Sequence, residues 1–332
     1  MKKLICMILS MLMLLTLVSF AGCGSKAGLK FGLGVYTNVT EATNAVGDAN
    51  GQGAAAITAA AITVDADGKV VACDLDTADL TVAYTGEGKA IANDSFRTKR
   101  EMGKDYNMVT YGKASKEWYE QADAFEALVK GKTCDEIKAL VAQGNKGTEE
   151  VINGGCTIMI HEFVRAIEKA FANLADSKAT AKDAVKLGTN TEQSLQDAVE
   201  DKNGYNQIET TFFAAAVNAD GKIVAASAEC VQIQFGFDAS GASTYDKSKT
   251  VSGKKELGAA YGMTKYGADL NGDGVVKEWM EQVAAFEAAC LGKTAGDISA
   301  LMNDKNYGNA DLQAAGCTIL VNGLVKAAAK IG

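Results

Sequence analysis

Residues 116–133 read Lys116-Glu-Trp-Tyr-Glu-Gln-Ala-Asp-Ala-Phe-Glu-Ala-Leu-Val-Lys-Gly-Lys-Thr133, and the pattern returns at residues 277–294 as Lys277-Glu-Trp-Met-Glu-Gln-Val-Ala-Ala-Phe-Glu-Ala-Ala-Cys-Leu-Gly-Lys-Thr294. The only two tryptophans of the chain, Trp118 and Trp279, take the same place in each copy. Two shorter pairs surround this stretch: Gly155-Cys-Thr-Ile158 with Gly316-Cys-Thr-Ile319, and Asp67-Gly-Lys69 with Asp220-Gly-Lys222. The sequence therefore predicts one domain written twice.

The repeated stretch predicts an amphipathic helix, because its large apolar residues recur at helical spacing. These residues are Trp118, Ala122, Phe125 and Val129 in the first copy, and Trp279, Val283, Phe286 and Cys290 in the second. Gly131 and Gly292 follow, where a left-handed residue commonly ends a helix. The stripe indicates packing in a core rather than a cofactor or carbohydrate platform.

β-prone runs precede each helix. Residues 54–64 and 70–75 are joined by Asp65-Ala-Asp-Gly-Lys69, and Asp-Gly between two such runs is typical of an antiparallel hairpin. A third run covers residues 80–84. The second copy repeats this plan with residues 208–217, a turn at 218–221 and residues 223–237.

Two further helices are expected in each copy. Thr133 and Glu136 form a capping box that opens a short helix to about residue 142, and Thr294 with Asp297 is a weaker version. A final helix is expected to start at Gly-Cys-Thr in each copy. The predicted fold class is α+β, with two tandem homologous domains, each an antiparallel strand meander followed by three helices packed on one face. The domains are expected at residues 54–175 and 187–332, with a linker at 176–186.

The start of the chain predicts export. Lys2 and Lys3 precede an apolar run over residues 4–20, which ends in Phe20-Ala-Gly-Cys23 and is typical of a signal peptide over residues 1–22. The small residues before Cys23 resemble the lipobox of bacterial lipoproteins, which implies that Cys23 carries a lipid. Residues 23–53 are then a tether, and the protein lies on the extracellular face of the cell membrane. Plain secretion is the alternative.

The net charge of the chain argues against nucleic acid as a partner. Removing residues 1–22 takes away two of the 33 basic residues and none of the 41 acidic ones, so the formal net charge changes from −8 to −10. Such a surface repels phosphate backbones and disfavours nucleic acid.

Of the cysteines after Cys23, only Cys156 and Cys317 match between the copies. We therefore interpret these cysteines as small buried hydrophobic residues rather than a disulfide framework.

No motif in the chain predicts a reaction. The single histidine, His161, has Asn322 at the matching place of the second copy, and no nucleophile motif accompanies it. We interpret His161 as a solvated or hydrogen-bonded helix residue, and we predict that the protein is not an enzyme.

One insertion in the second copy suggests calcium. Asp269-Leu-Asn-Gly-Asp-Gly274 resembles the first half of an EF-hand or dockerin calcium loop, with Asp269, Asn271 and Asp273 at the alternating ligand positions. Met280 stands where the family has its bidentate acid, and Glu281 follows it. The resemblance implies a Ca²⁺ site formed by Asp269, Asn271, Asp273 and Glu281. An ordinary Asp/Asn/Gly-rich turn is the alternative.

The Gly-Cys-Thr motif suggests a second ligand. Gly155 and Gly316, placed before a helix, are expected to offer free N–H groups to a phosphate. The repeat resembles the FMN-binding domains of bacterial membrane-anchored electron carriers, which have Asp-Gly-Lys at a hairpin turn and a threonine that carries FMN through a phosphoester bond. The resemblance implies Thr157 and Thr318 as attachment points. Alternatively, these threonines are N-caps of the terminal helices.

These observations favour a lipid-anchored, non-catalytic binding or carrier protein. The first specific hypothesis is an FMN-carrying electron-transfer lipoprotein, in which the cofactor supplies the chemistry. The alternative is a cofactor-free surface scaffold or ligand-binding lipoprotein. The expected partners are the membrane, through the lipid, and a small molecule or protein of unknown identity.

Overall fold

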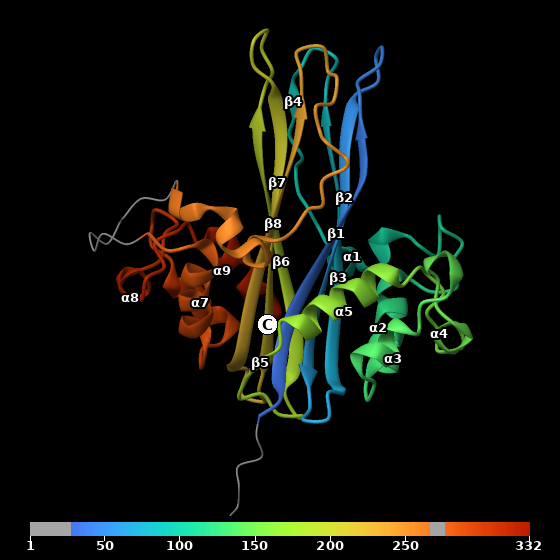
Figure 1. The fold of residues 1–332 in the computed structure, drawn as a ribbon, viewed down its shortest axis with the longest axis vertical. Coiled ribbons are helices and arrows are strands. Elements are labelled where there is room, and N and C mark those ends of the chain that lie inside the picture. The colour runs from blue at the N-terminus through green and yellow to red at the C-terminus, as the bar shows by residue number, and fades with distance from the viewer. Residues whose placement is uncertain (1–27, 266–275) are drawn as a thin grey trace, which may run out of the picture.

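Two antiparallel sheets pack face to face, and helices cover the outer face of each sheet (Figure 1). The computed structural model describes residues 28–265 and 276–332. We refer to residues 28–178 as the first half, and to residues 179–265 and 276–332 as the second half. The chain is α+β, and its layers run helix, sheet, sheet, helix.

The first half contributes a five-stranded sheet with the order β4-β3-β2-β1-β5. Its strands are β1 (Lys30–Thr43), β2 (Gly51–Val64), β3 (Val70–Tyr84), β4 (Ala90–Ile91) and β5 (Ala175–Asp176). The second half contributes a three-stranded sheet with the order β6-β7-β8. Its strands are β6 (Ala184–Gln196), β7 (Gly204–Val217) and β8 (Ile223–Phe237).

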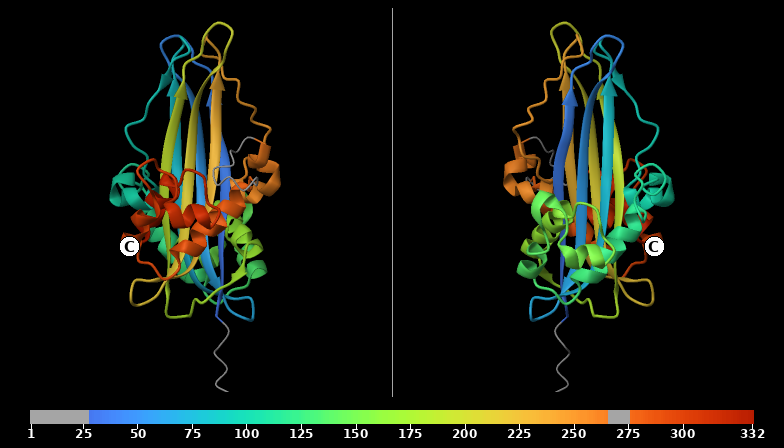
Figure 2. Two further views of the ribbon diagram at one scale, coloured as in Figure 1. Left: turned by 90° about the vertical axis from the view of Figure 1, so that its left-hand side faces the viewer. Right: turned by 90° about the vertical axis from the view of Figure 1, so that its right-hand side faces the viewer.

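Both predicted hairpins are confirmed. β2 pairs with β3 and β7 with β8 in antiparallel register, and the turns between them hold Gly68 at φ 76° and Gly221 at φ 74°. The Asp65 carboxylate accepts hydrogen bonds from the N–H groups of Asp67 and Lys69, which closes the first turn. The long hairpins extend beyond the helices at one end of the molecule, and β1 begins at the other end (Figure 2).

Both faces of each central strand are buried. Phe212 and Phe213 are both fully buried, but they belong to different clusters, because successive residues of a strand point to opposite faces. Phe213 packs under the helices of the second half, whereas Phe212 points into the space between the sheets. This double burial explains the nearly continuous apolar run of residues 54–64 in β2.

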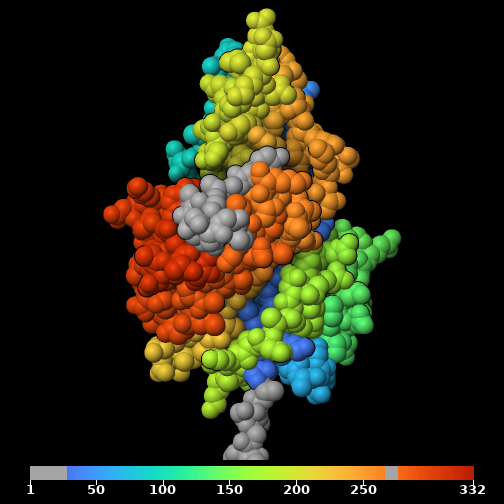
Figure 3. Space-filling model, turned by 60° about the vertical axis from the view of Figure 1, so that its left-hand side comes forward, coloured from blue at the N-terminus to red at the C-terminus, as the bar shows by residue number. Residues whose placement is uncertain are grey.

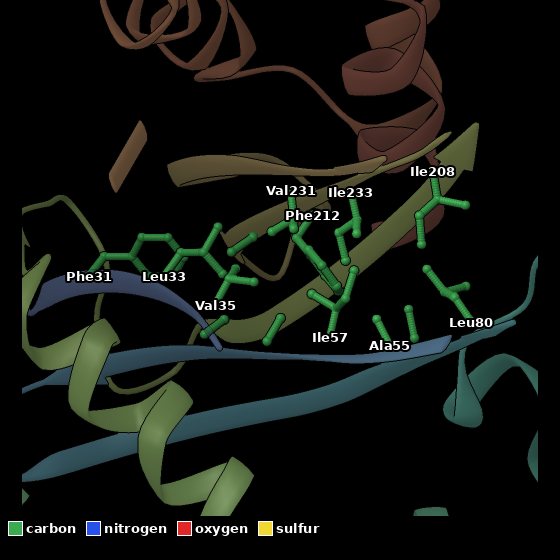
Figure 4. Close-up of a cluster of buried hydrophobic side chains, with 14 of the residues drawn as sticks. Phe31, Leu33, Val35, Ala55, Ile57, Leu80, Ile208, Phe212, Val231 and Ile233 are labelled. Carbon is green, nitrogen blue, oxygen red and sulfur yellow. The ribbon is translucent and has the colours of Figure 1, made fainter. Parts of the chain in front are cut away.

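A cluster shared by the two halves fills the space between the sheets (Figure 4). It joins Phe31, Leu33 and Val35 of β1 and Ile57 of β2 with second-half residues. The main second-half members are Ile208, Phe212, Val231 and Ile233. The repeated apolar patterns predict a core for each half but not this third, shared core.

The helices of the first half pack on the outer face of its sheet, around Trp118 and Phe125. They are α1 (Lys99–Met102), α2 (Trp118–Val129), α3 (Cys134–Lys138), α4 (Glu149–Asn153) and α5 (His161–Ala172), with short 3₁₀ turns at Gly103–Tyr106 and Gln143–Asn145. α2 confirms the helix predicted from the repeated stretch, and the predicted Thr133 capping box opens α3. α1 and α4 were not predicted.

The second half has a similar order of helices around Trp279 and Phe286. They are α6 (Lys254–Leu257), α7 (Trp279–Cys290), α8 (Ala310–Ala314) and α9 (Asn322–Ala328), with 3₁₀ turns at Gly258–Tyr261, Met263–Lys265, Ala295–Leu301 and Ala329–Ile331. The Thr294 box opens a 3₁₀ turn rather than an α-helix. No helix of residues 28–265 and 276–332 is long and apolar enough to cross a membrane.

Two predicted connections need correction. The tether at residues 23–53 is wrong from residue 30 onward, because β1 pairs with β2 along its length and buries Phe31, Leu33 and Val35. The linker at residues 176–186 is shorter than predicted, since Asp176 ends β5 and Ala184 begins β6.

Candidate functional site

A buried glutamine in each half holds the Gly-Cys-Thr loop against the tryptophan helix. Gln121 of α2 is fully buried, and its Oε1 accepts hydrogen bonds from the N–H (2.8 Å) and the hydroxyl (2.9 Å) of Thr157. In the second half, Gln282 Oε1 accepts the same pair from Thr318, at 2.8 and 3.0 Å. Sequence reasoning missed both glutamines, although each stands at the same place in the repeated stretch.

The threonines are not helix N-caps. α5 begins at His161 after Ile160, and α9 begins at Asn322 after Val321, so each helix starts four residues beyond its threonine. The prediction that their hydroxyls cap the terminal helices is therefore wrong, because each hydroxyl donates a hydrogen bond to a glutamine instead.

The glycines do not offer free helix N-terminal groups either. Gly155 N–H donates to Ile152 O and Gly316 N–H donates to Gln313 O, so both are already bonded in the turns that end α4 and α8. Their φ angles are 100° and 97°, and a Cβ at either glycine would collide with the ammonium of Lys116 or Lys277. The prediction of a phosphate site on these N–H groups is wrong, and the glycines instead leave room for a lysine.

A lysine lies beside the tryptophan in each half, and Lys254 is buried whereas Lys99 is half-buried. Lys254 Nζ is 2.6 Å from Glu209 Oε1 and 5.9 Å from the centre of the Trp279 ring. In the first half, Lys99 Nζ is 3.2 Å from Asp79 and 5.9 Å from the Trp118 ring. Burial alone would lower the pKa of Lys254, but Cys230 and Glu209 beside it raise that pKa overall. Both lysines therefore act as fixed cations against an aromatic face.

Only some of the predicted residues come together in a pocket. Thr318 lines a pocket of about 350 Å³ with Lys254, Trp279, Gln282 and Tyr307. In the first half, the matching Thr157 is exposed at the surface. The pocket thus combines one residue that the motif predicted with a cation and two aromatic side chains that it did not.

The predicted calcium ligands are not brought together by the described residues. Asp269, Asn271 and Asp273 lie outside the described part of the chain. Glu281 lies in the first turn of α7, where its carboxylate accepts the N–H of Glu278 at 2.8 Å and completes a capping box. Within residues 28–265 and 276–332, no cluster of three or more His, Cys, Asp or Glu side chains could hold a metal ion.

The histidine and the cysteines are mostly enclosed. His161 Nδ1 is buried without a hydrogen-bond partner among the described residues, and its Nε2 lies 3.8 Å from Glu162 Oε1. The six described cysteines are all free thiols, and five are buried, as interpreted from the sequence. Burial raises the pKa of Cys156 and of Cys317 to about 11, so both thiols stay protonated at neutral pH.

Two buried acids fix the short helices that follow the sheets. Asp76 Oδ1 accepts the N–H of Thr77 at 2.7 Å and of Arg100 at 3.2 Å. Glu229 accepts three N–H groups at the start of α6 and in β8. Burial raises the pKa of Asp76 from 3.8 to about 6, despite these hydrogen bonds.

Replacing Asp76 by asparagine is expected to change the pH dependence of stability. The folded pKa is raised, so the contribution of Asp76 is fully present below pH 3.8 and is lost as pH rises through about 6. Between pH 4 and pH 7 the wild type should lose up to about 3 kcal/mol relative to Asp76→Asn. Urea unfolding at several pH values measures this difference. A constant difference across pH would contradict it, and Asp67→Asn, which removes an exposed turn carboxylate, is the control.

Comparisons of the chain with protein-family models, with curated proteins and with solved structures found no match.

Proposed function

We propose that the chain is a lipid-anchored, non-catalytic carrier that bears FMN on Thr318 for electron transfer at the extracellular face of a membrane. The observation that carries this proposal is the Thr318 pocket. There a threonine predicted by resemblance lines a space together with Lys254, whose ammonium is paired with Glu209, and with two aromatic side chains. Cys23 would carry the lipid.

The proposal includes duplication into two tandem homologous domains. Three observations support it. β7 follows β2 by 153 residues at both ends, and α7 follows α2 by 161. The same glutamine–threonine hydrogen bonds occur in both halves, and so does the lysine above the tryptophan ring. In this view the second copy keeps the carrier site, and the first copy keeps only its fold.

The residues around Thr318 fit FMN. Lys254 lines the pocket, where Glu209 takes one of its three donors, and Lys277 lies over Gly316, two residues before the threonine, so these two ammonium groups would be the ones to bind a phosphate. Trp279 and Tyr307 provide flat apolar surfaces suited to a ring system. Bound FMN would supply electron-transfer chemistry that side chains lack. Gln282 would keep the loop in place after esterification, because it also binds the N–H of Thr318.

The test is to produce residues 23–332 with and without a flavin transferase and to record absorption spectra and intact masses. With the transferase we expect yellow protein that is heavier by one FMN less one water. Thr318→Val should abolish both signals, and Thr157→Val, its matched control, should keep them. Colourless, unmodified wild type would reject the carrier, whereas loss in Thr157→Val alone would move the site to the first half.

Two further elements belong to the proposal. A Ca²⁺ ion held through Asp269, Asn271 and Asp273 would act as a local brace for the second half, with a weak dissociation constant of about 10⁻⁴ to 10⁻³ M, as in extracellular calcium modules.

The alternative function is a cofactor-free ligand-binding lipoprotein. It is favoured by a second and larger hollow, of about 680 Å³, between the two halves.

A further inference from the structure

A groove of about 680 Å³ runs between the two halves at one edge of the sheets. Figure 3 shows β1, in blue, at the bottom of this hollow, between the orange helices of the second half and the green α5. Phe31 and Leu33 of β1 lie on one side, and Val224 of β8, Ala288 of α7 and Leu291 just after α7 lie on the other. The groove therefore offers an apolar surface contributed by both halves.

Polar side chains also line the groove. Lys255 Nζ lies 2.7 Å from Glu287 Oε1 and 3.2 Å from Ser227 Oγ, and all three residues line the groove. An ammonium has three N–H donors, so these two partners leave one donor. The Ser227 oxygen accepts from Lys255, so its own proton remains to be donated.

Two other acids of the groove, Glu229 and Glu256, already have partners. Glu229 accepts hydrogen bonds from three backbone N–H groups. Glu256 is paired with Lys169 of α5 at 2.6 Å, a contact that joins the two halves. The remaining charged side chains, Asp176 and Lys178, have opposite signs. The donors of Lys255 and Ser227 are therefore not opposed by an unpaired buried carboxylate.

In the first half, the residue that matches Lys255 is surrounded by carboxylates of the protein itself. Arg100 corresponds to Lys255, and its guanidinium lies 2.7 Å from Asp123, 2.6 Å from Glu126 and 3.7 Å from Asp74. Asp74 also crosses between the sheets to accept the N–H of Leu187 at 2.8 Å. Three carboxylates thus surround the first-half cation.

The second half lacks two of these three carboxylates. The offsets of the repeat place Ser227 where Asp74 stands and Ala284 where Asp123 stands, and only Glu287 matches Glu126. Both replacements are smaller, and both line the groove. The first-half cation has three carboxylate neighbours, whereas Lys255 has one and is therefore open to a further carboxylate.

We infer that the groove binds a small amphipathic monocarboxylate. Its carboxylate occupies the place that corresponds to the Asp74 side chain of the first half. There it accepts hydrogen bonds from Lys255 and Ser227. Its aliphatic part lies against Phe31, Leu33 and Leu291. Charge-assisted hydrogen bonds fix the head, and burial of apolar area supplies affinity for the tail. This site is separate from the Thr318 pocket and does not require FMN.

The test uses residues 23–332, produced without flavin transferase, and decanoate as the probe. Calorimetric titration should show saturable binding of decanoate and weaker binding of decylamine and decanol. Lys255→Met should weaken decanoate binding by about tenfold or more, because a charged hydrogen bond is lost. Ser227→Asp, which restores the first-half residue, should abolish binding by pairing with Lys255 and filling the groove. Lys247→Met removes an exposed lysine elsewhere and should bind decanoate like the wild type.

Three results would overturn the inference. They are the absence of saturable binding to the wild type, equal affinity for decanoate and decylamine, and undiminished decanoate binding in Lys255→Met. If Ser227→Asp fails to fold, as judged by its unfolding curve, Ser227→Ala replaces it. That variant should weaken binding while leaving the groove open. Since no flavin is present, failure of the FMN proposal leaves these outcomes unchanged.

Discussion

Phe212→Ala is expected to lower the free energy of unfolding of the whole chain by about 3–5 kcal/mol. Phe212 is fully buried, comes from the second half, and belongs to the cluster that includes Phe31, Leu33 and Ile57 of the first half. Removing its ring leaves a cavity between the sheets, so both halves lose contacts. The structure therefore predicts one cooperative transition rather than two.

The two tryptophans allow each half to be followed separately. Trp118 and Trp279 are 3% and 4% exposed, so both should change fluorescence on unfolding. In a Trp279→Phe background the signal reports on the first half, and in a Trp118→Phe background it reports on the second. Phe212→Ala should shift both urea midpoints equally. A shift seen only through Trp279 would mean that the halves unfold independently. Val199→Ala, at an exposed hairpin tip, is the control and should change stability by less than about 0.5 kcal/mol.

The shared core could not have been predicted from periodicity alone. The apolar run of residues 54–64 indicates a strand buried on both faces, and the helix stripe containing Trp118 accounts for one of those faces. Nothing in the pattern identifies what covers the other face. In the structure it is the second sheet, contributed by residues more than 100 positions away in the chain.

β1 was missed for a different reason. Its Gly, Thr and Asn content weakens the strand signal, although the strand pairs with β2 from Lys30 to Thr43 with one bulge between Val39 and Glu41. One sequence signal could have found it. Ala45-Val-Gly-Asp-Ala-Asn-Gly51 returns as Ala198-Val-Glu-Asp-Lys-Asn-Gly204, at the same spacing of 153 as the Asp-Gly-Lys turns. Both segments join the first two strands of their sheets.

The Gly-Cys-Thr motif predicted one residue of the pocket. The motif singled out Thr318, which does line a pocket, but it misplaced the start of the following helix by four residues. The partner of the threonine, Gln282, lies 36 residues earlier and on another helix. A hydrogen bond between a loop and a distant helix leaves no periodic trace, so only the recurrence of glutamine in both copies could have suggested it.

Arg100→Met is expected to destabilise the protein by about 3–5 kcal/mol near pH 8, because it leaves three carboxylates without their cation. Arg100 is 30% exposed, and Glu126 and Asp74 are 15% and 16% exposed, so water compensates them only in part. Its guanidinium also donates to the carbonyl oxygen of Leu75, which would lose this partner.

The pH dependence separates the loss of charge from the loss of packing. Burial raises the pKa of Glu126 even beside Arg100, and removing the cation raises that pKa further. Loss of the cation also raises the pKa of Asp74, which burial already raises, so the destabilisation grows as pH rises through the raised pKa values of these two carboxyls and should be smaller at pH 5 than at pH 8. Urea unfolding at both pH values measures this difference. Equal losses at the two pH values would assign the effect to packing alone.

The second half provides the matched control for this argument. Lys255→Met leaves one carboxylate, Glu287, in place of three, so it should cost less than Arg100→Met at pH 8. A variant that combines Arg100→Lys, Asp74→Ser and Asp123→Ala copies the second-half residues into the first half. It should be more stable than Arg100→Met at pH 8, because Asp74 and Asp123, which Arg100→Met leaves without a cation, are removed together with the guanidinium. If the triple variant is no more stable than Arg100→Met, the carboxylates around Arg100 are not the cause of the loss.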